Sequence, residues 1–203
     1  MRGPAVVLKQ LVRRAASFVY HSSEMVWLVL DLRELRPRYT LRKGALPVVI
    51  LDDSNLEGFR EFRRTYPHRA GGRVLEDAGK PGFTCFMARL QDQFVGMFLV
   101  GTADYDYQEP RLRVKINPGE ACVFGIWIHP AHRGKMIAAA LVETALLEFK
   151  RRGFRWATGF TDRTNTPSLG ITERFGFQEK NHVRFHVVLG VQLRRKRQSF
   201  CER

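Results

Sequence analysis

Apolar residues recur along the first half of the chain at two spacings, and the two spacings predict different elements. Residues 5–20 carry an apolar stripe at intervals of three and four, which is typical of an amphipathic helix. Apolar runs over 25–32 and 47–51 predict strands. Residues 83–90 and 93–101 are two β-rich runs separated by only two residues, so they predict a hairpin.

The second half of the chain alternates strand and helix patterns. Residues 121–128 form a nearly continuous apolar run, which predicts a central strand buried on both faces. Residues 133–152 show helical periodicity and end in three cations and a glycine, a good helix stop. A strand over 154–161, a short helix over 166–176 and a final strand over 182–190 follow.

The remaining segments predict one short helix and two loops. Asp53 or Ser54 is suited to cap a helix over 55–65. Residues 68–82 are rich in Gly, Arg and Asp and predict a loop. Residues 102–119 predict a long surface loop, of the kind that often lines a binding site.

Composition adds a division of the chain by charge. The chain has 203 residues, 44% of them hydrophobic, and a net charge of +14, which suffices for one domain with a core. Residues 1–45 hold nine Lys/Arg against three acids, and the C-terminal end is again basic. We therefore expect a basic N-terminal helix and strand appendage over 1–45, one domain over 46–190 and a basic tail over 191–203.

Several classes of protein are disfavoured by the same composition. Three cysteines without CxxC spacing (Cys85, Cys122 and Cys201) argue against a disulfide framework or a zinc site, so no metal is expected. The longest apolar run, Met25 to Leu30, is far shorter than a membrane span. Charged residues interrupt the N-terminus where a secretion signal would need an apolar region. These features predict a cytoplasmic protein.

The two basic ends favour partners that carry phosphate. The stripe of the helix over 5–20, together with the cations of 194–197, fits peripheral contact with the anionic inner face of a membrane. Alternatively, the stripe packs on the domain and both basic runs are simply solvated. Nucleic acid is disfavoured as a partner because the chain has no recognition-helix pattern, aromatic ribonucleoprotein motif or zinc finger.

The junction IWIHPAHRGKMIAAALV carries the clearest candidate chemistry. A buried strand ends at Ile128, Pro130 stops it, and a helix is expected to start near Arg133. Backbone N–H groups at a helix start have no partner inside the helix, and small residues there let phosphates approach the backbone. Arg133 and Lys135 add positive charge. The pattern predicts a pyrophosphate cradle.

A second segment, NTPSLGITERFGF from Asn165 to Phe177, gives the junction a family context. With Ile128-His129-Pro130 followed by R-G-K-M-I-A, and with the later N-x-x-S and G-F, the chain resembles the GNAT superfamily of acetyl-CoA-dependent N-acyltransferases over about 83–190. The resemblance implies an α/β (α+β) fold: a mixed, mostly antiparallel central sheet flanked by helices, here with an extra N-terminal helix and strand. It also implies transfer of an acetyl or other acyl group from acyl-CoA to a primary amine by direct attack in a ternary complex.

The resemblance also implies which residues meet the cofactor. The strand end would lie along the pantetheine, the helix start would hold the pyrophosphate, and the later segment would line the far side. The implied residues are Ile126, Trp127 and Ile128; Arg133, Gly134, Lys135, Met136, Ile137, Ala138 and Ala139; and Asn165 and Ser168.

Two positions depart from the family pattern. Met136 stands where the family has its first motif glycine, so its side chain either turns away from the phosphates or reshapes the cradle. Thr172 stands where many members have a tyrosine that protonates the departing thiolate. Some members carry a glutamate base at the position of Cys122, and Glu120, two residues earlier, shares that face of the strand. Further candidates for proton transfer are His129, His132 and Asp162.

Three functions therefore remain open at this stage. The first is acyl transfer to a small-molecule, sugar or protein amine. The second is a catalytically weak or inactive GNAT-like module that binds CoA, and the third is a basic protein that binds nucleic acid. The acceptor, the acyl length and the oligomeric state are not encoded in any recognisable pattern.

Overall fold

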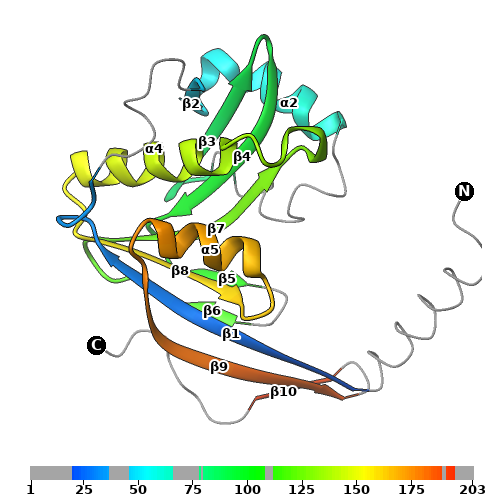
Figure 1. The fold of residues 1–203 in the computed structure, drawn as a ribbon, viewed down its shortest axis with the longest axis vertical. Helices are drawn as coiled ribbons and strands as arrows, with labels where there is room; N and C mark the ends of the chain where they lie inside the picture. Colours follow the sequence, from blue (N-terminus) through cyan, green and yellow to red (C-terminus); the bar gives the residue numbers. More distant parts are fainter. Residues whose placement is uncertain are drawn as a thin grey trace, which may run out of the picture.

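The computed structural model describes residues 20–36, 46–65, 78, 80–107, 112–188 and 191–194. Within these residues, eight strands form one sheet in the order β10-β9-β1-β8-β7-β4-β3-β2 (Figure 1). All neighbouring pairs of this described sheet are antiparallel except β7 and β8. The strands are β1 (Tyr20–Asp31), β2 (Val48–Ile50), β3 (Phe83–Leu90), β4 (Gln93–Gly101), β7 (Glu120–Ile128), β8 (Trp156–Asp162), β9 (Gln178–Val188) and β10 (Val191–Arg194). The expected mixed, mostly antiparallel sheet is confirmed.

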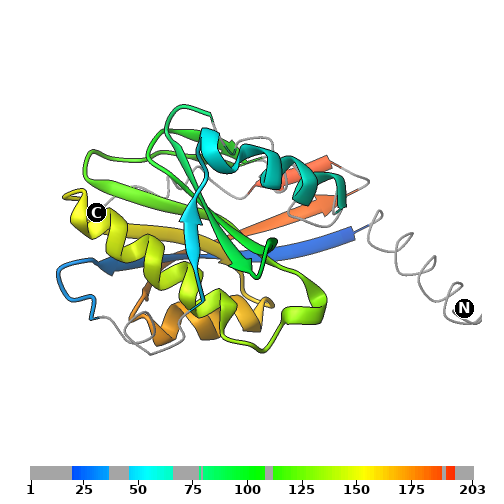
Figure 2. The ribbon, with the colours of Figure 1, turned by 90° about the horizontal axis from the view of Figure 1, so that it is seen from above.

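Helices cover both faces of this sheet. Figure 2 shows α4 and α5 on one face and α2 on the other, and we call these the α4 face and the α2 face. No helix of the described residues is long and apolar enough to cross a membrane. The helices are η1 (Asp53–Asn55), α2 (Leu56–Thr65), η2 (Pro130–His132), α4 (Ile137–Arg151) and α5 (Thr166–Arg174).

Each face of the sheet has its own hydrophobic core. Under α4 and α5 the core includes Leu141, Phe149 and Phe175. Under α2 it includes Phe59 and Phe62 from the helix, packed on residues of the strands. Burial of one such side chain contributes about 1.5–3 kcal/mol. The two cores therefore hold the sheet firmly as the middle of three layers.

The strand β1 lies inside the sheet, between β8 and β9. The predicted boundary at residue 45 would separate it from both neighbours. Its Val26 is 0% exposed, which a strand on an appendage would not require. Most of the predicted helix over 5–20 lies outside the described residues, and so does the tail after Arg194; residues 191–194 form the edge strand β10.

The predicted hairpin over 83–101 is present, with Gln91 and Asp92 in its turn. The expected loop over 102–119 differs, because it contains a second small sheet of β5 (Tyr105–Tyr107) and β6 (Leu112–Val114). The ring of Tyr105 lies 4.6 Å from that of Phe124, centroid to centroid. The β5–β6 pairing and this ring contact, which joins residues nearly twenty positions apart, give regular structure to a segment that looks polar and irregular in sequence.

The position of β1 leads to a stability prediction. We expect Val26→Ala to lower the free energy of unfolding by about 2 kcal/mol, since it removes buried methyl groups at about 0.8 kcal/mol each and leaves a cavity. The matched control is Ser22→Ala, at an exposed position of the same strand, which should stay within about 0.5 kcal/mol of the unchanged protein. Urea denaturation measures both, and equal midpoints for the two variants would mean that β1 adds nothing to the core.

Candidate active site

The parallel strands β7 and β8 run side by side for only part of their length. They pair from Glu120 to Val123 and from Trp156 to Gly159. Beyond those residues β7 pairs only with β4, and β8 pairs only with β1. We call the region between the two strands after Val123 and Gly159 the fork (Figure 1).

The fork exposes part of a strand that was expected to be buried on both faces. Val123, Gly125, Ile126 and Ile128 are all partly exposed, although β7 is an internal strand. The prediction of full burial is wrong for this half of β7, because β8 turns away and covers it no longer. A partly apolar surface is therefore open in the middle of the sheet.

The backbone of β7 presents polar groups to the fork. The N–H of His129 donates to Val95 O on β4 at 2.8 Å. Since backbone groups alternate along a strand, those of Trp127 point to β4 and those of Ile126 and Ile128 point to the fork. The Ile128 carbonyl accepts a hydrogen bond from Arg133 Nε at 3.2 Å. Of the three residues predicted along a pantetheine, Ile126 and Ile128 thus face the fork and Trp127 does not.

The helix after β7 starts later than predicted. The short η2 helix and a turn occupy residues 130–136, and α4 begins at Ile137 with Met136 as its N-cap. No side chain caps this end, and the first helical bond runs from the Ala140 N–H to Met136 O at 3.0 Å. The N–H groups of 137–139 therefore have no partner within the helix, and the positive end of the helix dipole adds to their attraction for an anion.

Two residues of this turn have the left-handed backbone that favours glycine. Gly134 has φ of +78°, and a Cβ placed on it would meet nothing within 4 Å. Met136 has φ of 62° and ψ of 8°, and its side chain is 46% exposed. Met136 is thus exposed, and its backbone keeps the conformation that a glycine would take.

The polar side chains of this turn surround the start of α4. Arg133 and Lys135 are exposed. His129 accepts a hydrogen bond from the Ala131 N–H through Nδ1. Burial lowers the pKa of His132, and nearby Lys135 and His129 lower it further, so its imidazole is neutral at pH 7. We call these residues, with the start of α4, the cradle, after the pyrophosphate cradle that the sequence predicts here; the open fork adjoins it.

The start of α5 lies on the other side of the fork, after β8. Asn165 is the N-cap, and its side-chain oxygen accepts from the Ser168 N–H at 3.3 Å. The Thr172 hydroxyl donates to the carbonyls of Ser168 and Leu169 at 3.1 and 2.9 Å. Its proton is therefore engaged within the helix, which is an unfavourable position for protonating a thiolate.

The turn that carries Asn165 is held by contacts that sequence reasoning missed. The Arg163 N–H donates to Glu24 O on β1 at 2.8 Å, and the Ser23 hydroxyl donates to Asp162. Arg163 and Arg184 both bond the Glu24 carboxylate. Arg184 and then Arg163 hold the pKa of Glu24 below its usual value. No local pattern signals these pairs, since Glu24 and Arg163 are 139 positions apart.

The candidate base lies on the α2 face at the start of β7, three residues before the last pair of the β7–β8 ladder. Glu120 is 3% exposed, and its Oε2 accepts from the backbone N–H and the side-chain Nδ2 of Asn117 at 3.1 Å each. Cys122 stands two residues along and is fully buried, opposite Thr158 on β8. Asp162 lies farther along β8 on the same face, and its carboxylate accepts hydrogen bonds from Ser23 and Thr164.

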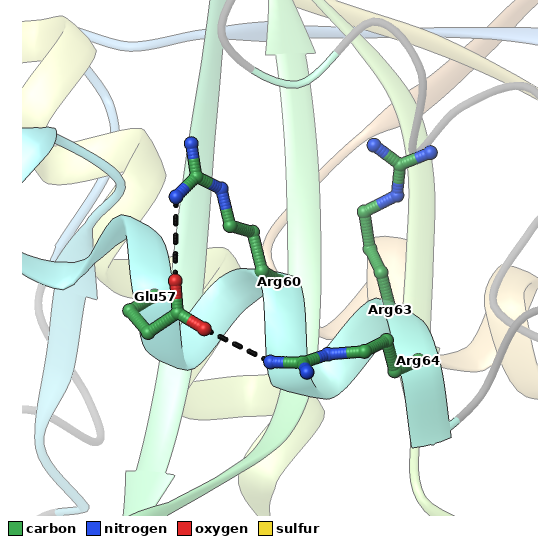
Figure 3. A pocket seen from close by; sticks show the side chains of 4 residues that line it. All are labelled: Glu57, Arg60, Arg63 and Arg64. Carbon is green, nitrogen blue, oxygen red and sulfur yellow. Dashed lines mark hydrogen bonds and ion pairs between the residues drawn. The ribbon is translucent and has the colours of Figure 1, made fainter.

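A hollow of about 610 Å³ lies apart from the fork, on the outer side of α2 (Figure 3). Glu57, Arg60, Arg63 and Arg64 line it. Glu57 pairs with Arg60 at 3.3 Å and with Arg64 at 2.9 Å. These side chains are strongly exposed, so the pairs contribute little to stability.

The backbone of the cradle leads to a second stability prediction. Met136→Gly should raise the free energy of unfolding by up to about 1 kcal/mol, because the left-handed conformation costs a side chain about 1–2 kcal/mol and glycine returns only part of that as chain entropy. The matched control, Gly134→Ala, places a side chain on the same conformation in open space and should lose about 1 kcal/mol. Urea denaturation measures both changes, and a loss in Met136→Gly would show that its side chain makes stabilising contacts.

Comparison with known proteins places this site in a family. A sequence model of the "Acetyltransferase (GNAT) family" matches residues 47–177. No curated protein matches the chain.

Solved structures share the fold at low identity. A putative GNAT-family acetyltransferase from Novosphingobium aromaticivorans has a TM-score of 0.55 at 14% identity, over 81% of this chain and 63% of that one. A GCN5-related N-acetyltransferase from Sphaerobacter thermophilus has 0.56 at 16%, over 91% and 58%. The chain thus spans less than two thirds of the length of both proteins. The acetyltransferase AAC(6')-Iy, bound to the bisubstrate analog CoA-S-monomethyl-acetylneamine, has 0.52 at 19%, over 76% and 100%.

The family match runs from the start of the β2 region to the end of α5, and so includes the fork and both helix starts. It covers well over half of the chain. This protein therefore belongs to the acetyltransferase (GNAT) family.

Proposed function

We propose that this protein transfers an acetyl or other acyl group from acyl-CoA to a primary amine by direct attack in a ternary complex. The observation that carries the proposal is the uncapped start of α4 beside the fork. Three unpartnered N–H groups and two cations meet there, next to the exposed backbone edge of β7. This combination suits a ligand with a diphosphate at one end and an amide-bearing arm at the other.

The described residues fit acyl-CoA in three places. The N–H groups of 137–139, with Arg133 and Lys135, would hold the pyrophosphate. The fork-facing backbone of Ile126 and Ile128 would pair with the pantetheine arm, and the start of α5 would close the other side. A bisubstrate analog that contains CoA, bound to a protein of this fold, supports the choice of a CoA ligand.

The thioester would supply an activated acyl carbon, and this chain would supply position and electrostatics. Backbone N–H groups of β7 at the fork would polarise the thioester carbonyl and stabilise the oxyanion. Glu120 is our candidate for accepting the proton that the amine loses, since it is a buried carboxyl group on the α2 face of β7, three residues before the ladder ends. Thr172 is the weaker of the two predicted catalytic residues because its hydroxyl already donates to backbone carbonyls.

The acceptor is proposed only as a class. The similar structure AAC(6')-Iy carries an acetylneamine-containing analog, so its ligand includes an amino sugar. An amino sugar, another small amine and a protein amine all satisfy the same chemistry, because each offers a nitrogen that attacks once it is neutral.

The engaged hydroxyl of Thr172 favours a second candidate, a module that binds CoA without turnover. A thiol-release assay with acetyl-CoA and a panel of amines separates the two, alongside calorimetric titration with CoA. Binding with thiol release supports the transferase, binding without release supports the module, and absence of binding contradicts both.

The cradle leads to a binding prediction. The double variant Arg133→Ala with Lys135→Ala should weaken CoA affinity tenfold or more, because each charge-assisted phosphate contact contributes about 1.5–3 kcal/mol. Calorimetric titration measures the dissociation constant.

The matched control removes two arginines from the outer side of α2, Arg60→Ala with Arg63→Ala (Figure 3). It lowers the net charge by the same amount but should leave CoA affinity within twofold of the unchanged protein. Equal losses in the two double variants would mean that charge alone, and not the cradle, attracts the cofactor.

A further inference from the structure

One buried hydroxyl near the fork has no hydrogen-bond partner. Among the described residues, two buried side-chain atoms lack any partner, Nδ1 of His132 and Oγ1 of Thr158. His132 belongs to the cradle already described, whereas Thr158 is 2% exposed in the middle of β8. Burying a polar group without a partner costs about 1–3 kcal/mol. The site therefore suits a partner that the protein itself does not supply.

Thr158 lies at the closed end of the fork. It stands opposite Cys122, one residue before the pairing of β7 and β8 ends. Because Ala157 belongs to the core of the α4 face, alternation along β8 directs Thr158 to the α2 face. The next residue, Gly159, faces the α4 side, where a Cβ on it would lie 3.4 Å from Cβ of Val123.

The surroundings of Thr158 combine apolar walls with one carboxylate. Phe124 and Phe160 lie on the same face, with ring centroids 6.2 Å apart. Glu120 also lies on this face, two residues before Cys122, so it is a diagonal neighbour of Thr158 across the two strands. In such a poorly solvated place a hydrogen bond to a ligand is stronger than it would be in water.

In our proposed function the two faces of the sheet bind different substrates. The starts of α4 and α5 hold the cofactor on the α4 face in our proposed function, and the thioester reaches the fork from that side. The α2 face of the fork then remains for the acceptor, and this is the face on which Thr158 and Glu120 lie. On β8 that face carries two side chains with oxygens: Asp162, which is already bonded to Ser23 and Thr164, and Thr158, whose hydroxyl has no partner and which lies at the closed end of the fork.

We propose that Thr158 is a catalytic residue that binds the attacking amine and passes its proton to Glu120. The inference rests on the proposed function. The amine nitrogen forms a bond to the thioester carbonyl carbon, and the carbon–sulfur bond then breaks and releases the thiolate. The proton lost by nitrogen goes to Thr158 Oγ1, while the hydroxyl proton goes to the Glu120 carboxylate through one water. Thr158 ends neutral, and the negative charge has moved from Glu120 to the thiolate.

The test uses three variants of the full chain with acetyl-CoA and a reactive amine. Thr158→Val keeps the shape but removes the hydroxyl, and we expect kcat to fall a hundredfold with CoA affinity unchanged. Thr158→Ser restores a hydroxyl and should stay within about fivefold of the unchanged protein. Thr84→Val, the same change at a partly buried position of β3, is the matched control and should retain full activity.

The pH dependence separates a proton-transfer role from a packing role. The rise of kcat with pH that reports the base should vanish in Glu120→Gln and also in Thr158→Val, whereas a packing defect would scale the profile without changing its form. Should Thr158→Val fail to fold, Thr158→Ala and Thr158→Ser give the same comparison.

The outcomes distinguish this inference from the function on which it rests. An active protein whose Thr158→Val variant keeps kcat within twofold overturns the role of Thr158 and leaves acyl transfer standing; unchanged activity with lower stability would assign the hydroxyl to a structural water, and higher stability would mean that it has no partner of any kind. An unchanged protein that binds no CoA, or releases no thiol with any amine, overturns the proposed transferase and this role together.

Discussion

The parallel ladder between β7 and β8 stops at Val123 and Gly159, and the candidate site depends on that interruption. A fully paired central strand would bury its backbone groups in hydrogen bonds and its side chains under both cores. Here β7 keeps β4 as a neighbour but loses β8, so Ile126 and Ile128 present peptide groups to an open side. An unpaired strand edge in the middle of a sheet is costly unless water or a ligand satisfies it. The fold thus leaves one edge of β7 without a neighbouring strand, and this edge is the candidate binding surface.

Keeping the fork open requires that β8 be held elsewhere. The strand β1 holds β8, because residues 25–31 of β1 pair with β8 along the whole length of β8. On its other side β1 pairs with β9. Ser23 and Glu24 of β1 also hold the turn after β8 through Asp162 and Arg163. The Arg163–Glu24 ion pair is partly exposed and contributes little alone. Together with the backbone bond, however, it places the start of α5 opposite the start of α4.

The cradle combines backbone strain with an uncapped helix. Met136 keeps a left-handed conformation that costs an ordinary side chain about 1–2 kcal/mol, and it offers no capping group to the N–H groups that follow. Such strain persists where the surrounding structure fixes it, and it is common at ligand sites. The α2 side of the fork shows the same kind of cost, because Thr158 buries a hydroxyl without a partner.

Local signals in the sequence determined most of the elements, including the turn before α4 and the start of α5. The apolar runs, the Pro130 stop and the Asn165 cap act over a few residues, so the order of the main strands and helices from β3 to α5 could be predicted, although β5 and β6 could not. The sequence predicted the start of α4 near Arg133, whereas the helix begins at Ile137. The difference arises because Gly134 and Met136 adopt positive φ and form a turn before the helix. Only tertiary structure decided that β1 enters the sheet, that β8 leaves β7, and that Thr158 lies beside the fork without a partner. Each of these depends on contacts between residues far apart in the chain, and no pattern of neighbouring residues encodes such contacts.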